Sequence, residues 1–249
     1  MPRAASVSRA SVPRPAAAPG ASIARYLTAR LAAAFIVRCY LRVRVEGIEC
    51  LPDGPAILCF NHQNWADPFV VMAALPWHPR LFFFGPKEED MARGGRNRIM
   101  AWTGASVPYK PAKNDLLGAT RRVEAVLSTG ARLAIAGEGR IHAGERALLP
   151  LSDGAAFFAL RAGVPIVPLA INGMSWIRFG RRVRVRVGAP IAAEGRPTRE
   201  AVDELTARTW TALHELVADF DEPRVPGPIG RAVTEWFNDW PEGRRPRAD

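Results

Sequence analysis

The sequence predicts a single α/β domain with a mixed, mostly parallel central sheet flanked by helices and one further helix at the N-terminal side. A chain of 249 residues with 48% apolar content can bury one sizeable core. Short apolar runs alternate with segments of helical periodicity, as expected for strands covered by helices. We therefore expect a tail, a first helix, a main domain and an extension, at residues 1–20, 21–41, 42–222 and 223–249.

The tail, residues 1–20, consists mainly of Pro, Ala, Ser and Arg and ends at Gly20. This composition cannot bury enough apolar surface to offset the entropy lost on ordering, so we predict a disordered basic tail. An acid-free segment rich in Arg and Ser is also typical of organellar transit peptides, and that alternative stays open. Residues 1–45 contain eight arginines and no acidic residue, so this part of the chain is expected to meet an anionic surface.

Residues 21–41 have helical periodicity, with apolar side chains interrupted by Arg25, Arg30 and Arg38. The longest uncharged apolar run, 31–37, is far shorter than the roughly 20 residues that a membrane-spanning helix needs. An apolar face with arginines that reach toward lipid head groups is typical of an interfacial helix. We predict that this helix lies on an anionic membrane, although a helix packed on the protein's own core would show the same pattern.

The main domain is expected to open with an alternating strand at 42–46, followed by turns and a buried apolar strand at 56–60. Directly after this strand comes the polar septet Asn61-His62-Gln63-Asn64-Trp65-Ala66-Asp67, and a helix begins at Asp67-Pro68. Since ligands of open α/β sheets bind beyond the carboxyl ends of the strands, the septet is the first candidate for a functional site.

His62 and Asp67 suit general-base chemistry. The unperturbed pKa of imidazole lies near neutrality, and a carboxylate on one ring nitrogen fixes the tautomer and stabilises the imidazolium that forms at the other. An Asp before Pro is equally what a plain helix N-cap looks like. A metal site is less favoured because no His, Cys or acidic cluster supplies further ligands nearby.

Several later segments are expected to extend the sheet. The apolar run 81–84 predicts a buried strand, and a helix at 115–127 precedes a strand at 132–136. This last strand leads into Gly137-Glu138-Gly139-Arg140-Ile141-His142. Two glycines around an acid permit close backbone approach, so amide groups and Arg140 could bind a phosphate. An ordinary glycine-containing turn is the alternative.

The remaining segments predict two helices, two strands and a short amphipathic end. A helix at 149–162, capped at Ser152 and ended by Gly163, precedes a strand at 164–170. Arg and Val alternate over 181–188, which predicts an edge strand with a row of exposed arginines. A helix at 198–220 follows, and the aromatic side chains of the extension either reach a lipid interface or dock on the domain: Trp236, Phe237 and Trp240.

The pattern His62…Asp67 resembles the H-x4-D motif of the glycerolipid acyltransferases, the family of 1-acylglycerol-3-phosphate acyltransferases. Glu138 and Gly139 are similar to the acid and glycine of the family's F-P-E-G-T-R motif. The sequence departs from that motif in two places, because Gly137 replaces the proline and the arginine comes one position early. Another departure lies at Tyr109-Lys110, where the family usually has an arginine, and the run 164–168 resembles the family's fourth motif.

The resemblance implies that 42–222 is an acyltransferase domain in which His62, oriented by Asp67, deprotonates a hydroxyl of lysophosphatidic acid or a related lysophospholipid. The hydroxyl would attack the thioester of acyl-CoA or acyl-carrier protein, without a metal or another cofactor. The resemblance assigns acceptor binding to Lys110, Glu138, Gly139 and Arg140. It assigns the acyl pocket to Val164, Pro165, Ile166, Val167 and Pro168.

The expected location is the cytoplasmic face of a membrane, as a peripheral or monotopic protein. Two alternatives remain open, namely a non-catalytic membrane-binding protein of the same fold and an acyl thioester hydrolase in which His62 activates water. Despite the formal charge of +10, no motif for nucleic-acid binding occurs. Cys39, Cys50 and Cys59 lack C-x-x-C spacing, so neither a disulfide framework nor a zinc site is expected.

Overall fold

The computed structural model describes residues 23–87, 99–100, 102–109, 116–142, 144–222 and 224–238. Their strands form one sheet in the order β1-β7-β6-β2-β5-β3-β4. Neighbouring strands are parallel except β6 and β7, so β1 and β7 run against the other five. The predicted mixed, mostly parallel sheet is confirmed. The strands are β1 (Leu41–Glu46), β2 (Ile57–Phe60), β3 (Leu81–Lys87), β4 (Ser106–Tyr109), β5 (Arg132–Ala136), β6 (Ile166–Asn172) and β7 (Arg181–Val187).

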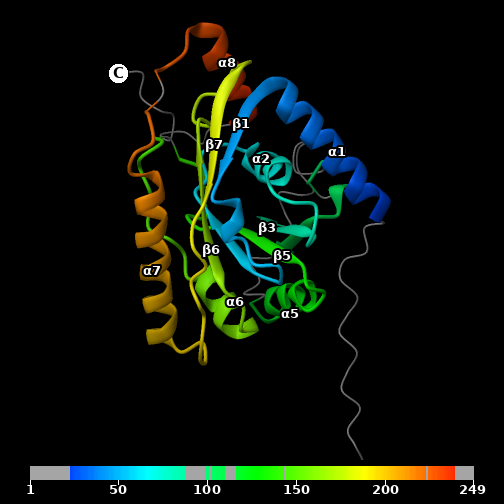
Figure 1. The fold of residues 1–249 in the computed structure, drawn as a ribbon, viewed down its shortest axis with the longest axis vertical. Helices are drawn as coiled ribbons and strands as arrows, with labels where there is room; N and C mark the ends of the chain where they lie inside the picture. The colour runs from blue at the N-terminus through cyan, green and yellow to red at the C-terminus, as the bar shows by residue number, and fades with distance from the viewer. Residues whose placement is uncertain are drawn as a thin grey trace, which may run out of the picture.

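Helices cover both faces of the sheet (Figure 1). The side chains of β2 show the division, because Leu58 and Phe60 pack with α1 and α2 while Ile57 and Cys59 pack with α5, α6 and α7. Two cores therefore lie on opposite sides of a buried central strand, as expected for strands with continuous apolar runs. The helices are α1 (Ile23–Tyr40), α2 (Asp67–Ala74), α5 (Leu116–Leu127), α6 (Gly154–Ala162), α7 (Arg199–Val217) and α8 (Pro228–Asn238), with a short 3₁₀ turn, η1 (Ile48–Cys50).

Helix α6 ends as predicted but begins later than predicted. Gly163 ends it in the left-handed conformation, with φ of 64°, which a glycine adopts without a steric cost. The predicted cap at Ser152 is wrong, because the helix starts at Gly154 and Ser152 lies in the preceding loop. Both the backbone N–H and the hydroxyl of Ser152 donate to the carbonyl of Gly137, at 2.8 and 3.0 Å. Ser152 therefore fixes the glycine-containing turn instead of a helix end.

Strand β7 lies inside the sheet, between β1 and β6, so the predicted edge strand is wrong. Arginines of β7 form ion pairs with carboxylates of other segments, and the alternating pattern of one strand does not show such partners. Arg186 contacts Glu46 of β1 at 2.9 Å and also pairs with Asp219, while Arg184 lies 3.3 Å from Glu46. These hydrogen bonds, that from Arg186 most of all, lower the pKa of Glu46. The charge row therefore joins two strands and the end of α7.

Helix α1 divides into a packed side and an exposed apolar side. Its packed side includes Arg30, which is 1% exposed and donates to the Tyr26 hydroxyl and to the carbonyls of Leu75 and Pro76, at 2.9, 2.6 and 2.7 Å. The expectation that Arg30 reaches toward lipid is therefore wrong. The other side carries four large apolar residues at four-residue spacing, each between 40% and 71% exposed: Ile23, Leu27, Leu31 and Phe35. No helix in the described part of the chain has the length and apolarity to cross a membrane.

Candidate active site

The polar septet forms a tight turn between β2 and α2, which we call the His62 turn (residues 61–67). It lies at the carboxyl end of the central strand β2, as the sequence predicts. Asn61 joins this turn to β6, because its side-chain amide donates to the carbonyl of Ile171 at 2.9 Å and accepts from the amide of Ile171 at 2.7 Å. These paired bonds continue the β2–β6 contact past the last residue of β2.

Asp67 accepts three hydrogen bonds at one carboxylate oxygen. Its Oδ2 atom receives the N–H groups of Gln63 and Asn64, at 2.7 and 2.9 Å, and lies 2.9 Å from Nδ1 of His62. Asp67 occupies the first turn of α2, where the helix dipole favours a negative charge, but its side chain makes no capping bond to that helix. The plain N-cap interpretation is therefore wrong, since the carboxylate turns back toward the histidine.

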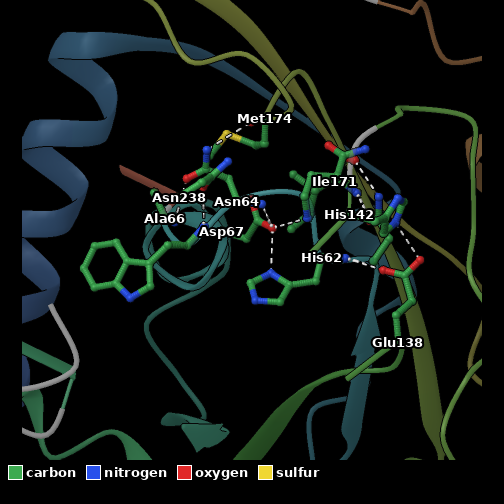
Figure 2. Close-up of polar contacts among 12 residues, drawn as sticks. His62, Asn64, Ala66, Asp67, Glu138, His142, Ile171, Met174 and Asn238 are labelled. Carbon is green, nitrogen blue, oxygen red and sulfur yellow. Dashed lines mark hydrogen bonds and ion pairs between the residues drawn. The ribbon is translucent and has the colours of Figure 1, made fainter. Parts of the chain in front are cut away.

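The ring of His62 is held at Nδ1 and open at Nε2 (Figure 2). In the neutral ring the N–H group is at Nδ1, where it donates a hydrogen bond to the carboxylate, so the lone pair lies on Nε2. The His62 side chain is 18% exposed while that of Asp67 is 0% exposed, so solvent and ligands reach the ring but not its partner. The ring of Phe60 packs edge-on against the imidazole, with centroids 5.9 Å apart. This arrangement can take a proton from a bound hydroxyl or water.

Every backbone N–H group from His62 to Asp67 has an acceptor. Besides the two that donate to Asp67, the amide of Ala66 donates to Oδ1 of Asn64 at 2.9 Å and the amide of Asp67 to the carbonyl of Asn64 at 3.0 Å. The amide of His62 donates to Glu138, and the amide of Trp65 donates to Asn238, at 2.7 and 3.0 Å. The backbone of the His62 turn is therefore fixed by side chains from three regions of the chain.

Glu138 holds the backbone of His62. Its Oε2 atom accepts from the amide of His62, and its Oε1 atom accepts from the amide of Leu149 at 2.9 Å. The ring of His142 lies 2.7 Å from Oε1, and the amide of His142 donates to the carbonyl of His62 at 3.0 Å. The side chain of Glu138 is 0% exposed. Both oxygens of Glu138 thus serve internal donors, and its role in acceptor binding stays a prediction.

The other predicted acceptor-binding residues of this turn lie on its surface. Gly139 has φ of 65°, and its N–H group donates to the carbonyl of Ala136 at 3.1 Å, so this amide already has an acceptor within the turn. Arg140 follows directly and is exposed. Lys110 lies outside the described residues. Arg140 lies two positions after Glu138, which contacts the backbone of His62, and the side chain of Arg140 is exposed.

Gly137 stands where the family motif has proline, and the packing explains the change. A Cβ atom at this position would lie 2.7 Å from Sγ of Cys59 and 2.8 Å from a methyl group of Leu151. The N–H group of Gly137 donates to the carbonyl of Phe60 at 3.0 Å, which a proline could not do. Burial, with a smaller contribution from Glu138, raises the pKa of the Cys59 thiol to about 12, so this thiol is not a nucleophile at neutral pH.

The predicted acyl-pocket run, Val164 to Pro168, comprises the end of a loop and the first half of β6. Ile166 and Val167 are fully buried and fill the cores on opposite faces of the sheet. Ile166 pairs with Ile57, the first residue of β2, so the run begins at the end of the sheet away from His62. Such burial is what a core strand requires, and the acyl-pocket role stays a prediction.

Glu145 is a buried acid that the sequence did not single out. Its carboxylate accepts from the amides of Gly173 and Ser175, at 2.7 and 3.2 Å, and from the side chain of Asn172 at 3.0 Å. Burial raises the pKa of Glu145 despite these bonds. The loop that it holds after β6 presents the carbonyl of Met174 to the side chain of Asn64 at 3.2 Å. Glu145 therefore supports the His62 turn indirectly.

Four further supporting side chains had weak signals in the sequence or none. Asn61 and Asn64 belong to the septet, and their position beside apolar runs is the signal that could have indicated buried anchors. His142 is the last residue of the glycine-containing segment, and no pattern in the sequence indicates a role for it. Asn238 gave no signal, because it contacts a residue 173 positions earlier in the chain. Among the described residues, no group of three or more His, Cys, Asp or Glu side chains could hold a metal ion.

Comparisons with known proteins agree with this architecture. The acyltransferase family profile matches residues 42–172, more than half of the chain. The 1-acyl-sn-glycerol-3-phosphate acyltransferase of Pseudomonas aeruginosa is 25% identical over 209 residues, 78% of this chain and 77% of the relative. The 1-acyl-sn-glycerol-3-phosphate acyltransferase alpha of Ovis aries is 26% identical over 210 residues, 77% of this chain and 71% of the relative.

The fold also occurs in a solved structure. The crystal structure of the 1-acyl-sn-glycerophosphate (LPA) acyltransferase PlsC from Thermotoga maritima superposes with a TM-score of 0.58 over 80% of each chain, at 18% identity. Residues 42–172, which the family profile matches, contain the His62 turn, the segment around Glu138 and the strand β6. The chain therefore belongs to the acyltransferase family and is an acyltransferase.

Proposed function

We propose that this acyltransferase moves a fatty acyl group from an acyl thioester, acyl-CoA or acyl-carrier protein, to the free hydroxyl of lysophosphatidic acid or a related lysophospholipid. The observation that carries the proposal is the 2.9 Å contact between Nδ1 of His62 and the fully buried Asp67, with Nε2 accessible. The names of the Pseudomonas and sheep relatives support this acceptor.

In the proposed reaction, Nε2 of His62 takes the proton of the acceptor hydroxyl as its oxygen attacks the thioester carbonyl. The new C–O bond forms, the C–S bond breaks, and the imidazolium returns the proton to the leaving thiolate. The Asp67 carboxylate stabilises the imidazolium between these steps and keeps the ring oriented through Nδ1. Neither proposed step calls on a metal or another cofactor, because the histidine alone takes the proton from the hydroxyl and passes it to the leaving thiolate.

The acceptor's phosphate is assigned to Arg140 and the exposed turn at Gly139, with Lys110 as a further cation. Arg140 is exposed in the turn after β5, two residues beyond Glu138, and a guanidinium binds phosphate through two parallel N–H groups. Its neighbour Glu138 fixes the backbone of His62. A phosphate bound at Arg140 would therefore lie on the segment that also holds the backbone of His62 through Glu138.

The proposed location is the cytoplasmic face of an anionic membrane, with α1 lying on it. The exposed apolar residues of α1 form one stripe, and the helix contains no acidic residue to repel anionic lipid. Arg25 lies within this helix and is exposed. Apolar contact together with cationic attraction is the usual basis of peripheral binding. A lysophospholipid acceptor would then reach the enzyme from the membrane surface.

Acyl transfer with purified protein tests the function. Radiolabelled acyl-CoA and acyl-carrier protein are offered with a panel of lysophospholipids to the wild type, to His62→Ala and to His214→Ala. His214 is an exposed histidine of α7 and serves as the matched control. We expect acceptor-dependent product that falls by at least 10²-fold in His62→Ala only. Free fatty acid as the sole product would indicate a hydrolase, and vesicle binding without any turnover would indicate a non-catalytic protein.

A further inference from the structure

One backbone amide of the His62 turn donates to a residue outside the segment that the family profile matches. The amide of Trp65 donates to Oδ1 of Asn238, the last residue of α8, at 3.0 Å. The acceptors for the other amides of the turn all lie within residues 61–138. Trp65 lies between His62 and Asp67 in the chain, so the position of its peptide affects how the two side chains meet.

Helix α8 presents two buried polar side chains to the domain. Thr234 and Asn238 are four residues apart and therefore lie on the same side of the helix, where they are 0% and 6% exposed. The hydroxyl of Thr234 accepts from the amide of Ile177 in the loop after β6, at 3.0 Å. Figure 2 shows Asn238 beside Asn64 and Met174, next to the turn. Helix α8 is thus attached at the two segments that surround the proposed base.

The contact at Trp65 is that of a positioning group rather than of general packing. Asn238 offers an oxygen to the peptide, while its side-chain nitrogen is buried and has no hydrogen-bond partner among the described residues. Only the acceptor atom is therefore used. A buried amide that loses its acceptor must find another partner or move toward water. Either response displaces the peptide that connects His62 to Asp67.

We propose that Asn238 is a positioning residue for the acyl transfer and that α8 acts as a strap that holds the His62 turn in its reactive geometry. This inference rests on the proposed role of His62 as the base. Helix α8 touches neither the ring of His62 nor the carboxylate of Asp67 in any described hydrogen bond. Its effect is therefore on the chemical step, because a displacement of about 1 Å in a catalytic group costs on the order of 10²-fold in rate.

The test compares Asn238→Leu with Asn238→Asp in the full-length protein. Leucine has a similar size but no acceptor, whereas aspartate keeps an oxygen in the same place and replaces the unpaired nitrogen. We expect Asn238→Leu to lower kcat by roughly 10- to 100-fold with little change in the KM of either substrate. We expect Asn238→Asp to recover most of that loss. Equal kcat values for Asn238→Leu and the wild type would overturn the proposal.

Two further variants separate positioning from stability and from the proposed function. Thr209→Val removes a buried hydroxyl that donates to Leu205 inside α7, so it costs stability without touching the turn. Its kcat should stay at the wild-type value below its melting temperature, and an equal loss in Thr209→Val and Asn238→Leu would also refute positioning. His62→Ala distinguishes the two claims: if it keeps full turnover, the proposed function fails, whereas an inactive His62→Ala beside a fully active Asn238→Leu defeats only the strap.

Should Asn238→Leu not fold, Thr234→Val decides the question. This change releases α8 from Ile177 and leaves the contact at Trp65 intact. With the helix held at one segment only, we expect a kcat loss smaller than that of the leucine variant but above threefold. A Thr234→Val enzyme with unchanged kcat would show that the turn keeps its geometry without a firmly attached α8, and would contradict the strap.

Discussion

Asp67 places three N–H donors on one oxygen of a fully buried carboxylate, so its charge is compensated locally before any substrate binds. Two of these donors are backbone amides, which fix the position of the carboxylate. The third is the ring of His62, and of the three donors it alone can change its protonation state. In the proposed mechanism this carboxylate orients the ring of His62 and stabilises its protonated form. Its position before Pro68 alone would indicate only the start of a helix.

Asp67→Asn tests this role. The amide oxygen can still accept from Gln63 and Asn64, so the turn should fold, but an uncharged amide stabilises the imidazolium poorly and can impose the wrong tautomer. We expect kcat to fall by about 10²- to 10⁴-fold while the melting temperature changes by only a few degrees. Steady-state kinetics beside a thermal melt would decide it, and wild-type kcat in the variant would make Asp67 a purely structural residue.

Glu138→Gln and Arg140→Ala should affect different properties although the residues are two positions apart. The first should lower the stability of the fold, and the second should raise the KM for the acceptor. Glutamine turns one buried acceptor into a donor that faces an N–H group, which costs about 1–3 kcal/mol of stability. Alanine at exposed Arg140 should leave stability unchanged and raise the KM for the lysophospholipid. Urea titration and acceptor kinetics on both variants are the measurements. An unchanged acceptor KM in Arg140→Ala would remove this arginine from phosphate binding.

At the scale of elements, the glycine-containing turn after β5 depends on its packing against β2. Gly137 lies so close to Cys59 that a Cβ atom does not fit between them. Ser152, in the loop before α6, donates two hydrogen bonds to the carbonyl of Gly137. The glycine and the cysteine therefore form a matched pair across two strands. A side chain at position 137 therefore requires a change at Cys59 or Leu151.

Gly137→Ala is expected to destabilise the fold by about 1–3 kcal/mol, because the new methyl group lies within 3 Å of Sγ of Cys59. Adding Cys59→Ala should recover part of this loss by making room. The four proteins of this cycle, compared by urea unfolding, measure the coupling between the two positions. Additive losses with no recovery in the double variant would show that the clash is relieved elsewhere, for instance by movement of Leu151.

At the scale of the whole molecule, the exposed apolar stripe of α1 and the packed helices α5 to α7 lie on opposite faces of the sheet (Figure 1). The membrane binding that we propose for α1 therefore concerns one face of the sheet only. The His62 turn leads directly into α2, which packs against α1. A membrane bound through α1 would thus adjoin the layer of the protein that carries the base.

Leu31→Glu combined with Phe35→Glu should lower binding to vesicles of anionic phospholipid by at least tenfold, since two exposed apolar contacts become charges of the wrong sign. Leu117→Glu is the matched control, because Leu117 is 75% exposed on α5, on the opposite face of the sheet. Vesicle sedimentation measures all three proteins. Equal loss in the control would mean that lipid binding does not depend on the α1 face.

Local patterns in the sequence determined most of the elements and the pairing of His62 with Asp67. These features depend on residues within a few positions of one another, where apolar periodicity and spacing carry the information. The family motifs then located Glu138 and Arg140, although they did not separate the buried residue from the exposed one. Strand ends and glycine stops such as Gly163 are decided by the same short-range backbone preferences.

The tertiary structure alone decided which polar groups are buried together. Arg30 points into the domain because the carbonyls of Leu75 and Pro76 lie there, and β7 is an inner strand because β1 pairs beside it. Asn238 supports the His62 turn from 173 positions away. A buried polar side chain is stable only with a partner, and that partner is chosen by the fold, so no local pattern in the chain can name it.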